Sequence, residues 1–196
     1  MKLDEIQLIA ETIYAQLEPH CEKGFIHIAG GIRRKKPEPH DIELVVYPKK
    51  FQISEELFEA KKGMVPITEF INTIRQWQKL SGDPYGRYTK RLYQYGDEFD
   101  LVQVDIFMPQ KEDYWRIYAI RTGSADYSAK VIAPAWVKQG WRGTEDGLRL
   151  ELECTQISST KWACLKNNPT LPPVWQSERE LFTWLNIPYI EPEKRI

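Results

Sequence analysis

The stretch DIELVV, residues 41–46, decides the fold of this chain, and VQVDIF, residues 102–107, repeats its pattern. Both stretches alternate polar with β-branched or aliphatic residues, so both are predicted to be strands. Side chains along a strand point to alternate faces, so Asp41 and Glu43 share a face, and Asp105 joins them if the two strands pair. Three carboxylates on one face repel one another unless cations lie between them, and two-metal phosphoryl transfer needs that arrangement.

A pair of glycines lies just upstream of the first acidic strand. Residues 25–29 (FIHIA) are predicted to form a strand that ends at Gly30 and Gly31, and Arg33 and Arg34 follow. Two glycines let the backbone approach a ligand closely and expose its N–H groups. Arginines offer paired donors that match phosphate oxygens. A Gly-Gly pair alone indicates little, but just before an acid-x-acid strand it indicates a phosphate-binding turn.

The composition bounds the class of protein. With 196 residues, 42% hydrophobic and 28% charged, the chain matches a soluble globular protein of one domain or two small subdomains. It has no apolar run of membrane-spanning length and no secretory signal. Cys21, Cys154 and Cys164 are odd in number and lack the close spacing of metal ligands. We therefore expect a cytoplasmic protein with reduced thiols and no membrane partner.

The net charge of −1 is unusual for a protein that binds nucleic acid. The charge is unevenly placed, however, because basic residues gather at 33–36, 49–50, 61–62 and 87–91. Each cluster is either ordinary solvated surface or part of a groove that follows phosphates. If the groove exists, we expect weak, salt-sensitive affinity for DNA.

The first part of the chain has the pattern of an α+β domain. Residues 3–17 carry apolar side chains at helical spacing, and strands are predicted at 25–29, 41–47, 88–95 and 101–107. Thr68 is predicted to cap a helix that carries Trp77 and Leu80, and residues 81–87 are predicted to be a turn-rich loop. These elements predict a mixed or mostly antiparallel sheet flanked by helices over residues 1–109.

A small α+β subdomain is predicted for residues 110–196. Residues 113–139 are helical in pattern, with interruptions at Thr122-Gly123-Ser124 and at Pro134. Residues 147–165 alternate like a β-meander, and Ser177 with Glu180 predicts a capping box for a last helix. The tryptophans in this part are more typical of core packing than of base stacking.

These motifs, in this order, resemble the nucleotidyltransferase superfamily that includes DNA polymerase beta. Gly30-Gly31 with Arg33-Arg34 precedes Asp41-x-Glu43, and Asp105 follows. Thr122-Gly123-Ser124 lies where family X DNA polymerases have their Thr-Gly-Ser turn. Residues 177–195 resemble the family's ending, Glu-x-x-Phe followed by Tyr-x-x-Pro-x-x-Arg. The resemblance spans almost the whole chain and is to the minimal palm-plus-thumb form of the family.

The resemblance implies a palm at residues 1–109, a thumb-like subdomain at 110–196, and transfer of a nucleotide from a nucleoside triphosphate to a 3′-hydroxyl. It implies that Asp41, Glu43 and Asp105 bind two Mg²⁺ ions, with Mn²⁺ as a substitute, and that Asp105 can accept the hydroxyl proton. Arg34 matches the family's phosphate-binding arginine, whereas Arg33 is either a second donor or a surface charge. The implied nucleotide-binding residues are Gly30, Gly31, Arg33, Arg34, Thr122, Gly123 and Ser124.

Several departures from the family pattern bear on the substrate. Gly31 stands where the family usually has serine, and Glu43 stands where the DNA polymerases usually have aspartate. Before Thr122 the family commonly carries an aromatic pair that screens the sugar 2′-position, but here the residues are Ile120 and Arg121. Ser128 stands where an asparagine often contacts the base edge. The preference between ribo- and deoxyribonucleotides is therefore open.

Three functions follow from these patterns. The first is short gap-filling DNA synthesis in repair, on a primer end or gapped DNA, because the chain starts at the palm and is expected to lack the N-terminal lyase domain. The second is template-independent transfer to RNA ends, a small molecule or a protein. The third is non-catalytic binding of a nucleotide or nucleic acid. No protein partner can be inferred from the sequence.

Overall fold

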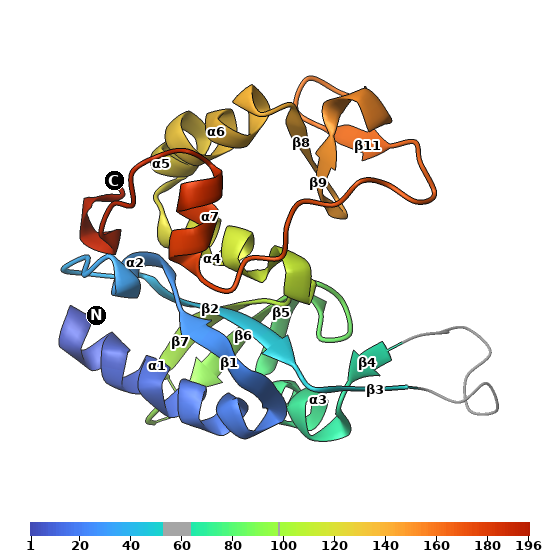
Figure 1. Cartoon of the computed structure of the whole chain (residues 1–196). Helices are drawn as coiled ribbons and strands as arrows, with labels where there is room; N and C mark the ends of the chain where they lie inside the picture. Colours follow the sequence, from blue (N-terminus) through green and yellow to red (C-terminus); the bar gives the residue numbers. More distant parts are fainter. Residues whose placement is uncertain (53–63, 98) are drawn as a thin grey trace. The chain divides into compact units, whose positions relative to one another are not determined.

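The computed structural model describes residues 1–52, 64–97 and 99–196. The chain divides into two compact units, Met1–Tyr114 and Trp115–Ile196 (Figure 1). The sequence predicted the boundary between residues 109 and 110, and the structure divides a little later, at the start of a helix. Lys61 and Lys62, one of the predicted basic clusters, lie outside the described residues. Within the described ranges, no helix is both long and apolar enough to cross a bilayer.

The first unit is built on a five-stranded sheet with the order β1-β2-β7-β6-β5. Among its neighbouring strands β2 and β7 run parallel, and the other pairs run antiparallel. The mixed sheet predicted from the sequence is therefore confirmed. Its strands are β1 (Cys21–Ile28), β2 (Asp41–Pro48), β5 (Gln78–Asp83), β6 (Tyr88–Gln94) and β7 (Leu101–Phe107), and a separate two-stranded ribbon consists of β3 (Lys50–Gln52) and β4 (Met64–Pro66).

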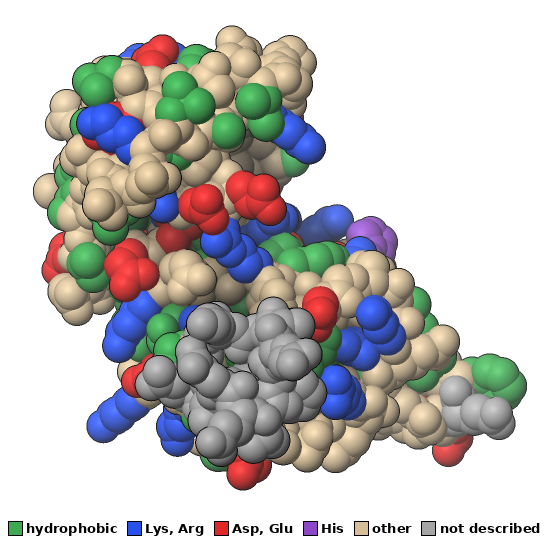
Figure 2. Space-filling view, turned by 90° about the vertical axis from the view of Figure 1, so that its right-hand side faces the viewer, with side chains coloured by type: hydrophobic (Ala, Val, Ile, Leu, Met, Phe, Trp, Pro, Cys, Tyr) green, Lys and Arg blue, Asp and Glu red, His purple; other side chains and the backbone are tan. Residues whose placement is uncertain are grey.

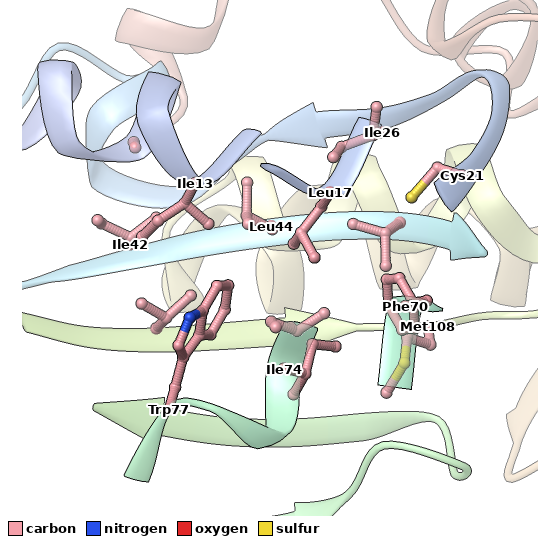
Figure 3. Packing of buried hydrophobic residues seen from close by; sticks show 14 of the residues in the cluster. Ile13, Leu17, Cys21, Ile26, Ile42, Leu44, Phe70, Ile74, Trp77 and Met108 are labelled. Carbon is pink, nitrogen blue, oxygen red and sulfur yellow. The ribbon is translucent and has the colours of Figure 1, made fainter. Parts of the chain in front are cut away.

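Helices cover one face of this sheet. α1 (Leu3–Leu17) and α3 (Thr68–Arg75) each bury an apolar stripe at helical spacing. Because side chains alternate along β2, Leu44 points into this core, whereas Asp41 and Glu43 point to the opposite face. Burying one such aliphatic side chain contributes about 1.5–3 kcal/mol, so the apolar residues fix the register of the strand. The core includes Ile6 and the residues Ile13, Leu17, Ile26, Ile42, Leu44, Phe70, Ile74 and Trp77, which are labelled in Figure 3.

The helix predicted to begin at Thr68 differs in both of its ends. Thr68 is the first helical residue, and Ile67 holds the capping position without a side-chain hydrogen bond. The helix ends at Arg75, so Trp77 lies beyond it, although it is still buried in the core. The apolar spacing that predicted a longer helix therefore came partly from a residue that follows the helix.

The strand β5 was missed because it has no buried face. All of its residues are exposed, so the sequence has no apolar alternation there, and Leu80 lies in this strand rather than on a helix. Gly82 adopts φ +72°, and the pairing with β6 shifts register between Lys79 and Ser81. Glycine is typical of turns, so the sequence predicted a loop here. The backbone instead continues as an edge strand that contains this glycine and an irregularity in its pairing.

The second unit begins with a run of short helices. The predicted interruptions are confirmed, because α4 ends at Thr122 and a π-helical turn lies directly before α6, the helix that contains Pro134. Ser177 caps α7 by accepting a hydrogen bond from the Glu180 backbone N–H at 3.2 Å. The helices are α4 (Tyr114–Thr122), α5 (Ala125–Tyr127), a π-helical turn (Ser128–Ile132), α6 (Ala133–Lys138) and α7 (Glu178–Trp184). Single 3₁₀ turns occur in this unit at Glu151–Glu153 and Pro192–Lys194, and in the first unit at Glu18–His20 and Lys111–Asp113.

The strands of the second unit form a four-stranded sheet, not a simple meander. Its order is β10-β11-β8-β9, and β11 pairs parallel with β8. A 3₁₀ turn interrupts the predicted alternation, so Leu152, which was expected to lie in a strand, is 81% exposed in that turn. The strands are β8 (Trp141–Thr144), β9 (Gly147–Leu150), β10 (Cys154–Gln156) and β11 (Trp162–Cys164).

Aromatic residues dominate the core of the second unit. Trp136 and Trp175 are buried there, and the ring of Trp184 lies 5.1 Å from Trp175 and 5.8 Å from Trp141. Ring pairs at these separations add to the stability that burial provides. The prediction that these tryptophans serve packing is confirmed, whereas Trp162 is half-buried and lies against the Arg142 guanidinium.

Candidate active site

The structure brings Asp41, Glu43 and Asp105 to one face of the first unit's sheet. The parallel pairing of β2 with β7 aligns Glu43 with Asp105 and Asp41 with Gln103. On the other side of β7, the antiparallel pairing with β6 aligns Lys90 with Asp105. Helices α1 and α3 cover the opposite face, so none of these side chains competes for space in the core. We call this surface the carboxylate face and define it by Asp41, Glu43, Tyr88, Lys90, Gln103 and Asp105.

Asp105 is the most enclosed of the three acids, and both of its oxygens are engaged. The Tyr88 hydroxyl donates a hydrogen bond to Oδ1, and the Gln103 amide Nε2 donates to Oδ2 at 2.8 Å. The Lys90 ammonium lies 3.5 Å from Oδ1. A buried carboxylate is costly without such partners, so these three groups explain how a charge can remain at this position.

Asp41 is half-buried, and its protonation is coupled to its neighbours. Burial raises the pKa of Asp41 above its usual range, and the negative charge of Asp105 raises it further. The positive charges of Lys90, His40 and Lys36 act in the opposite direction. A neighbouring negative charge raises the pKa of a carboxyl only at close range, so Asp41 and Asp105 face a common space.

Glu43 lies directly against Gly30. A side chain at Gly30 would collide with the Glu43 carboxyl group, and the backbone there adopts φ +61°. Both facts require glycine, because it has no Cβ and reaches positive φ without strain. The close approach is fixed by a hydrogen bond from the Ala29 N–H to the Glu43 carbonyl at 2.8 Å. The predicted glycine turn and the acidic strand are therefore neighbours in space.

The glycine turn leads into a single turn of helix, α2 (Gly30–Arg33). It is closed by hydrogen bonds from the Arg34 N–H to the Gly30 carbonyl at 3.1 Å and from the Lys36 N–H to the Gly31 carbonyl at 2.9 Å. Arg33 and Arg34 are both half-buried at its end, whereas Lys35 and Lys36 are exposed. This basic segment thus starts beside Glu43, at the edge of the carboxylate face.

Thr122, Gly123 and Ser124 lie in the second unit, at the end of α4. Thr122 is fully buried, and the Ser124 hydroxyl accepts a hydrogen bond from the Tyr127 N–H at 3.0 Å. A Cβ on Gly123 would lie 2.8 Å from the Tyr127 ring, so this turn is tightly packed. The Ser124 N–H donates to the Arg195 carbonyl at 2.9 Å, which ties the turn to the C-terminal segment.

The basic cluster at 87–91 does not form one surface. Lys90 contacts Asp105 on the carboxylate face, whereas Arg91 is buried on the helix-covered face and donates from Nε to Thr89 at 3.0 Å. Burial lowers the pKa of Arg91 below its usual range. On the described part of the face drawn in Figure 2, Lys and Arg side chains are interspersed with Asp and Glu side chains. A continuous basic surface is therefore not seen on that face.

The carboxylate face offers the ligand type that a divalent cation needs, although its side chains make other contacts. Carboxylate oxygens are preferred ligands of Mg²⁺. Glu43 lies against Gly30, and Asp105 is engaged by Tyr88, Lys90 and Gln103. Over the described ranges, no three His, Cys, Asp or Glu side chains are already gathered as a metal site. To bind a metal together, these side chains would have to turn from their present partners.

Sequence reasoning missed the groups that hold Asp105. Tyr88 and Lys90 alternate along a predicted strand, so the pattern placed them on one face of it. It did not give the register that aligns Lys90 with Asp105, because the turn between β6 and β7 sets that register. Gln103, two residues before Asp105 on the same strand, was available from the alternation alone.

Comparisons with known proteins agree with this geometry. Residues 118–196 match the family model of the DNA polymerase beta thumb. Among solved structures, the chain resembles Leishmania infantum polymerase beta in a ternary P/T complex, with a TM-score of 0.66 and 17% sequence identity, over 100% of this chain and 76% of that chain. No curated protein matches the chain in sequence. The chain therefore has the polymerase beta fold, and the resemblance to family X DNA polymerases is confirmed.

Proposed function

We propose that this chain is a nucleotidyltransferase that transfers a nucleotide from a nucleoside triphosphate to the 3′-hydroxyl of a DNA primer, as in short gap filling. The observation that carries the proposal is the register of β2 and β7. It aligns Glu43 with Asp105 and puts Asp41 on the same face, within a polymerase beta fold. Apolar packing on the other face gives no reason for three acids here, whereas two-metal phosphoryl transfer does.

Asp41, Glu43 and Asp105 would hold two Mg²⁺ ions, or Mn²⁺ in their place. When bound, these ions would lower the pKa of the attacking hydroxyl and neutralise charge on the phosphates. Asp105 would accept the hydroxyl proton, since its side chain is positioned by hydrogen bonds from Tyr88 and Gln103. The fixed orientation of this carboxylate supports that role.

The glycine turn and the basic segment after it would bind the triphosphate. Gly30 and Gly31 keep the backbone close to Glu43, and Arg33 and Arg34 follow within one helical turn. Guanidinium groups suit phosphate oxygens because they donate two parallel hydrogen bonds. In the second unit, the turn of Thr122, Gly123 and Ser124 would lie beneath the sugar and base. Its dense packing supports a positioning role.

A DNA primer end or gapped DNA is the proposed acceptor, bound weakly. The ternary P/T complex named for the Leishmania polymerase supports DNA as the partner class. The net charge of −1 and the mixed charges in Figure 2 favour low affinity, because phosphate contacts supply most of non-specific binding. The same mixed surface favours a second candidate, template-independent transfer to an RNA end, a small molecule or a protein.

The test is extension of a labelled primer on a one-nucleotide gap, with each deoxy- and ribonucleoside triphosphate supplied singly with Mg²⁺ or Mn²⁺. We expect template-directed addition that Asp105→Ala abolishes, with Asp105→Asn as the isosteric variant that keeps the side-chain volume. Thermal unfolding of both variants checks that the fold survives. Glu11→Ala removes an exposed carboxylate on the outer side of α1 and is expected to leave the rate unchanged.

Each of the other outcomes contradicts the proposal in a different way. Addition that ignores the template would favour the second candidate and move the search to RNA and small-molecule acceptors. Nucleotide binding without turnover, unaffected by Asp105→Ala, would indicate a non-catalytic binding protein. Retained transfer by the folded Asp105 variants would refute the assignment of this carboxylate.

A further inference from the structure

Lys90 is the positively charged residue among the six that define the carboxylate face. Across the sheet, Asp105 has Glu43 as its partner on one side and Lys90 as its partner on the other. The Lys90 ammonium lies 3.5 Å from Asp105 Oδ1, with side-chain exposures of 30% for Lys90 and 7% for Asp105. The amine therefore contacts the most buried acid of the face, while its stem remains partly open to water.

Lys90 shares its face with a second acid. The register puts Asp41 opposite Gln103, two residues before Asp105, so Asp41, Asp105 and Lys90 stand on three neighbouring strands of one face. Tyr88 and Gln103 are neutral and only donate hydrogen bonds to Asp105. Lys90 thus faces the space shared by Asp41 and Asp105, which is the space that a divalent cation would take.

We propose that Lys90 is an internal counter-ion of the carboxylate face: its ammonium compensates the acids in the metal-free protein and yields its position when divalent ions bind. The inference rests on the proposed function, because it assumes that these acids are metal ligands. A cation already in contact with a ligand opposes the binding of another cation by repulsion. Lys90 would then stabilise the empty site and weaken metal binding, so that the acids can be held close together without an ion.

A purely structural lysine would behave differently. If Lys90 only packed its stem along β6, removing its charge would change stability by the same amount with and without metal. If it is a counter-ion, the effect must depend on metal, because the ion takes over the compensation. Metal affinity in the absence of nucleotide and DNA therefore separates the two roles, without any measurement of activity.

The experiment titrates Mn²⁺ alone into the full chain, following free Mn²⁺ by its paramagnetic resonance signal, and measures unfolding temperature with chelator and with Mn²⁺. Lys90→Gln is expected to bind Mn²⁺ about tenfold more tightly than the parent chain. In chelator, Lys90→Gln is also expected to unfold at a lower temperature than the parent chain. Adding Mn²⁺ is expected to raise its unfolding temperature by more than it raises that of the parent chain. Lys90→Arg keeps the charge and is expected to resemble the parent.

Two further variants make the test decisive. Lys79→Gln removes an exposed lysine from β5 of the same sheet and is expected to leave Mn²⁺ affinity unchanged. Lys90→Met, which keeps the apolar stem, replaces Lys90→Gln if the latter does not fold. If a folded variant with a neutral residue at position 90 binds Mn²⁺ with unchanged affinity, the counter-ion role of Lys90 is refuted. The assignment of the acids as metal ligands is not affected by that result. If neither parent nor variant binds Mn²⁺ in a way that Asp105→Asn weakens, the metal assignment fails and the counter-ion with it.

Discussion

The two units are stabilised by different kinds of contact. The first unit packs an aliphatic stripe of α1 and α3 on one face of its sheet and keeps its acids on the other. The second unit has short elements and an aromatic core, and it contains a buried ion pair. Arg195 has no exposed surface, and its guanidinium contacts both oxygens of Glu178, at 2.6 and 3.1 Å.

This difference determines how each part of the proposed site is held. The acids stand on strands whose register is fixed by many non-directional apolar contacts, so no single polar contact decides their placement. The turn at Ser124 depends instead on a backbone bond to Arg195, and that residue is held by Glu178 and by the Ile190 carbonyl. The acidic part should therefore tolerate polar substitutions that disrupt the turn.

Breaking the buried ion pair of the second unit should have the largest effect. Arg195→Met leaves the Glu178 carboxylate buried without its partner, and such a loss costs about 3–5 kcal/mol in the free energy of unfolding. Urea denaturation followed by tryptophan fluorescence measures it, because all tryptophans except Trp77 lie in the second unit. The variant should also weaken nucleotide use, since Ser124 loses a fixed neighbour.

Arg179→Met is the matched control. Arg179 lies on the same helix as Glu178 and pairs with Glu191 at 3.4 Å, but both side chains are exposed. Such a pair contributes at most about 1 kcal/mol. Arg195→Met combined with Glu178→Leu should recover much of the lost stability, because no buried charge remains unpaired. Equal losses in the Arg195 and Arg179 variants would contradict the anchoring role.

A cavity in the first unit should cost somewhat less. Ile13→Ala removes a fully buried side chain from the stripe of α1, and deletions of this size cost about 2–5 kcal/mol. Leu8→Ala, on the exposed side of the same helix at 67% exposure, should change stability little. Unfolding of this unit can be followed by circular dichroism and by the fluorescence of Trp77. Equal effects of the two substitutions would mean that α1 does not carry the core.

The sequence was most reliable where burial and periodicity coincide. α1 has one apolar stripe and β2 alternates over residues 41–44, so both were predicted with nearly their observed bounds. The common face of Asp41 and Glu43 followed from the same alternation. The addition of Asp105 to that face required β2 and β7 to pair, which the pattern allowed and the structure contains. The roles of these acids remain predictions.

The sequence was least informative where contacts are long-range or polar. β5 is exposed on both faces, so no apolar period marked it. The parallel pairing of β11 with β8 joins strands that are distant in sequence, and local alternation carries no information about it. Lys90 appeared as one member of a basic cluster, because its contact with Asp105 depends on a register that only the folded sheet defines.

The smallest expected effect concerns a buried carboxylate of the second unit and appears only in acid. Glu153 accepts hydrogen bonds from Lys166 at 2.9 Å and from the Thr170 N–H and hydroxyl at 2.8 Å, with 2% of its side chain exposed. The Lys166 bond lowers the pKa of Glu153 below its usual value of 4.5, burial acts against it, and the Thr170 bonds add to the lowering.

The sign of the pH dependence follows from that shift. A carboxyl whose pKa is lower in the folded state stabilises the protein above its unfolded pKa, and this contribution disappears as the pH falls through the folded pKa. Urea midpoints measured from pH 7 down to about pH 3 should therefore fall less steeply in Glu153→Gln than in the parent. Glu151→Gln, in the same 3₁₀ turn but with a carboxylate that is 44% exposed in its pair with Arg142, should keep the parent's profile. If the urea midpoints of both variants fall with pH as steeply as those of the parent, the groups that donate hydrogen bonds to Glu153 do not favour its ionised form. The stability of the second unit would then depend on its aromatic core and the Arg195 ion pair alone.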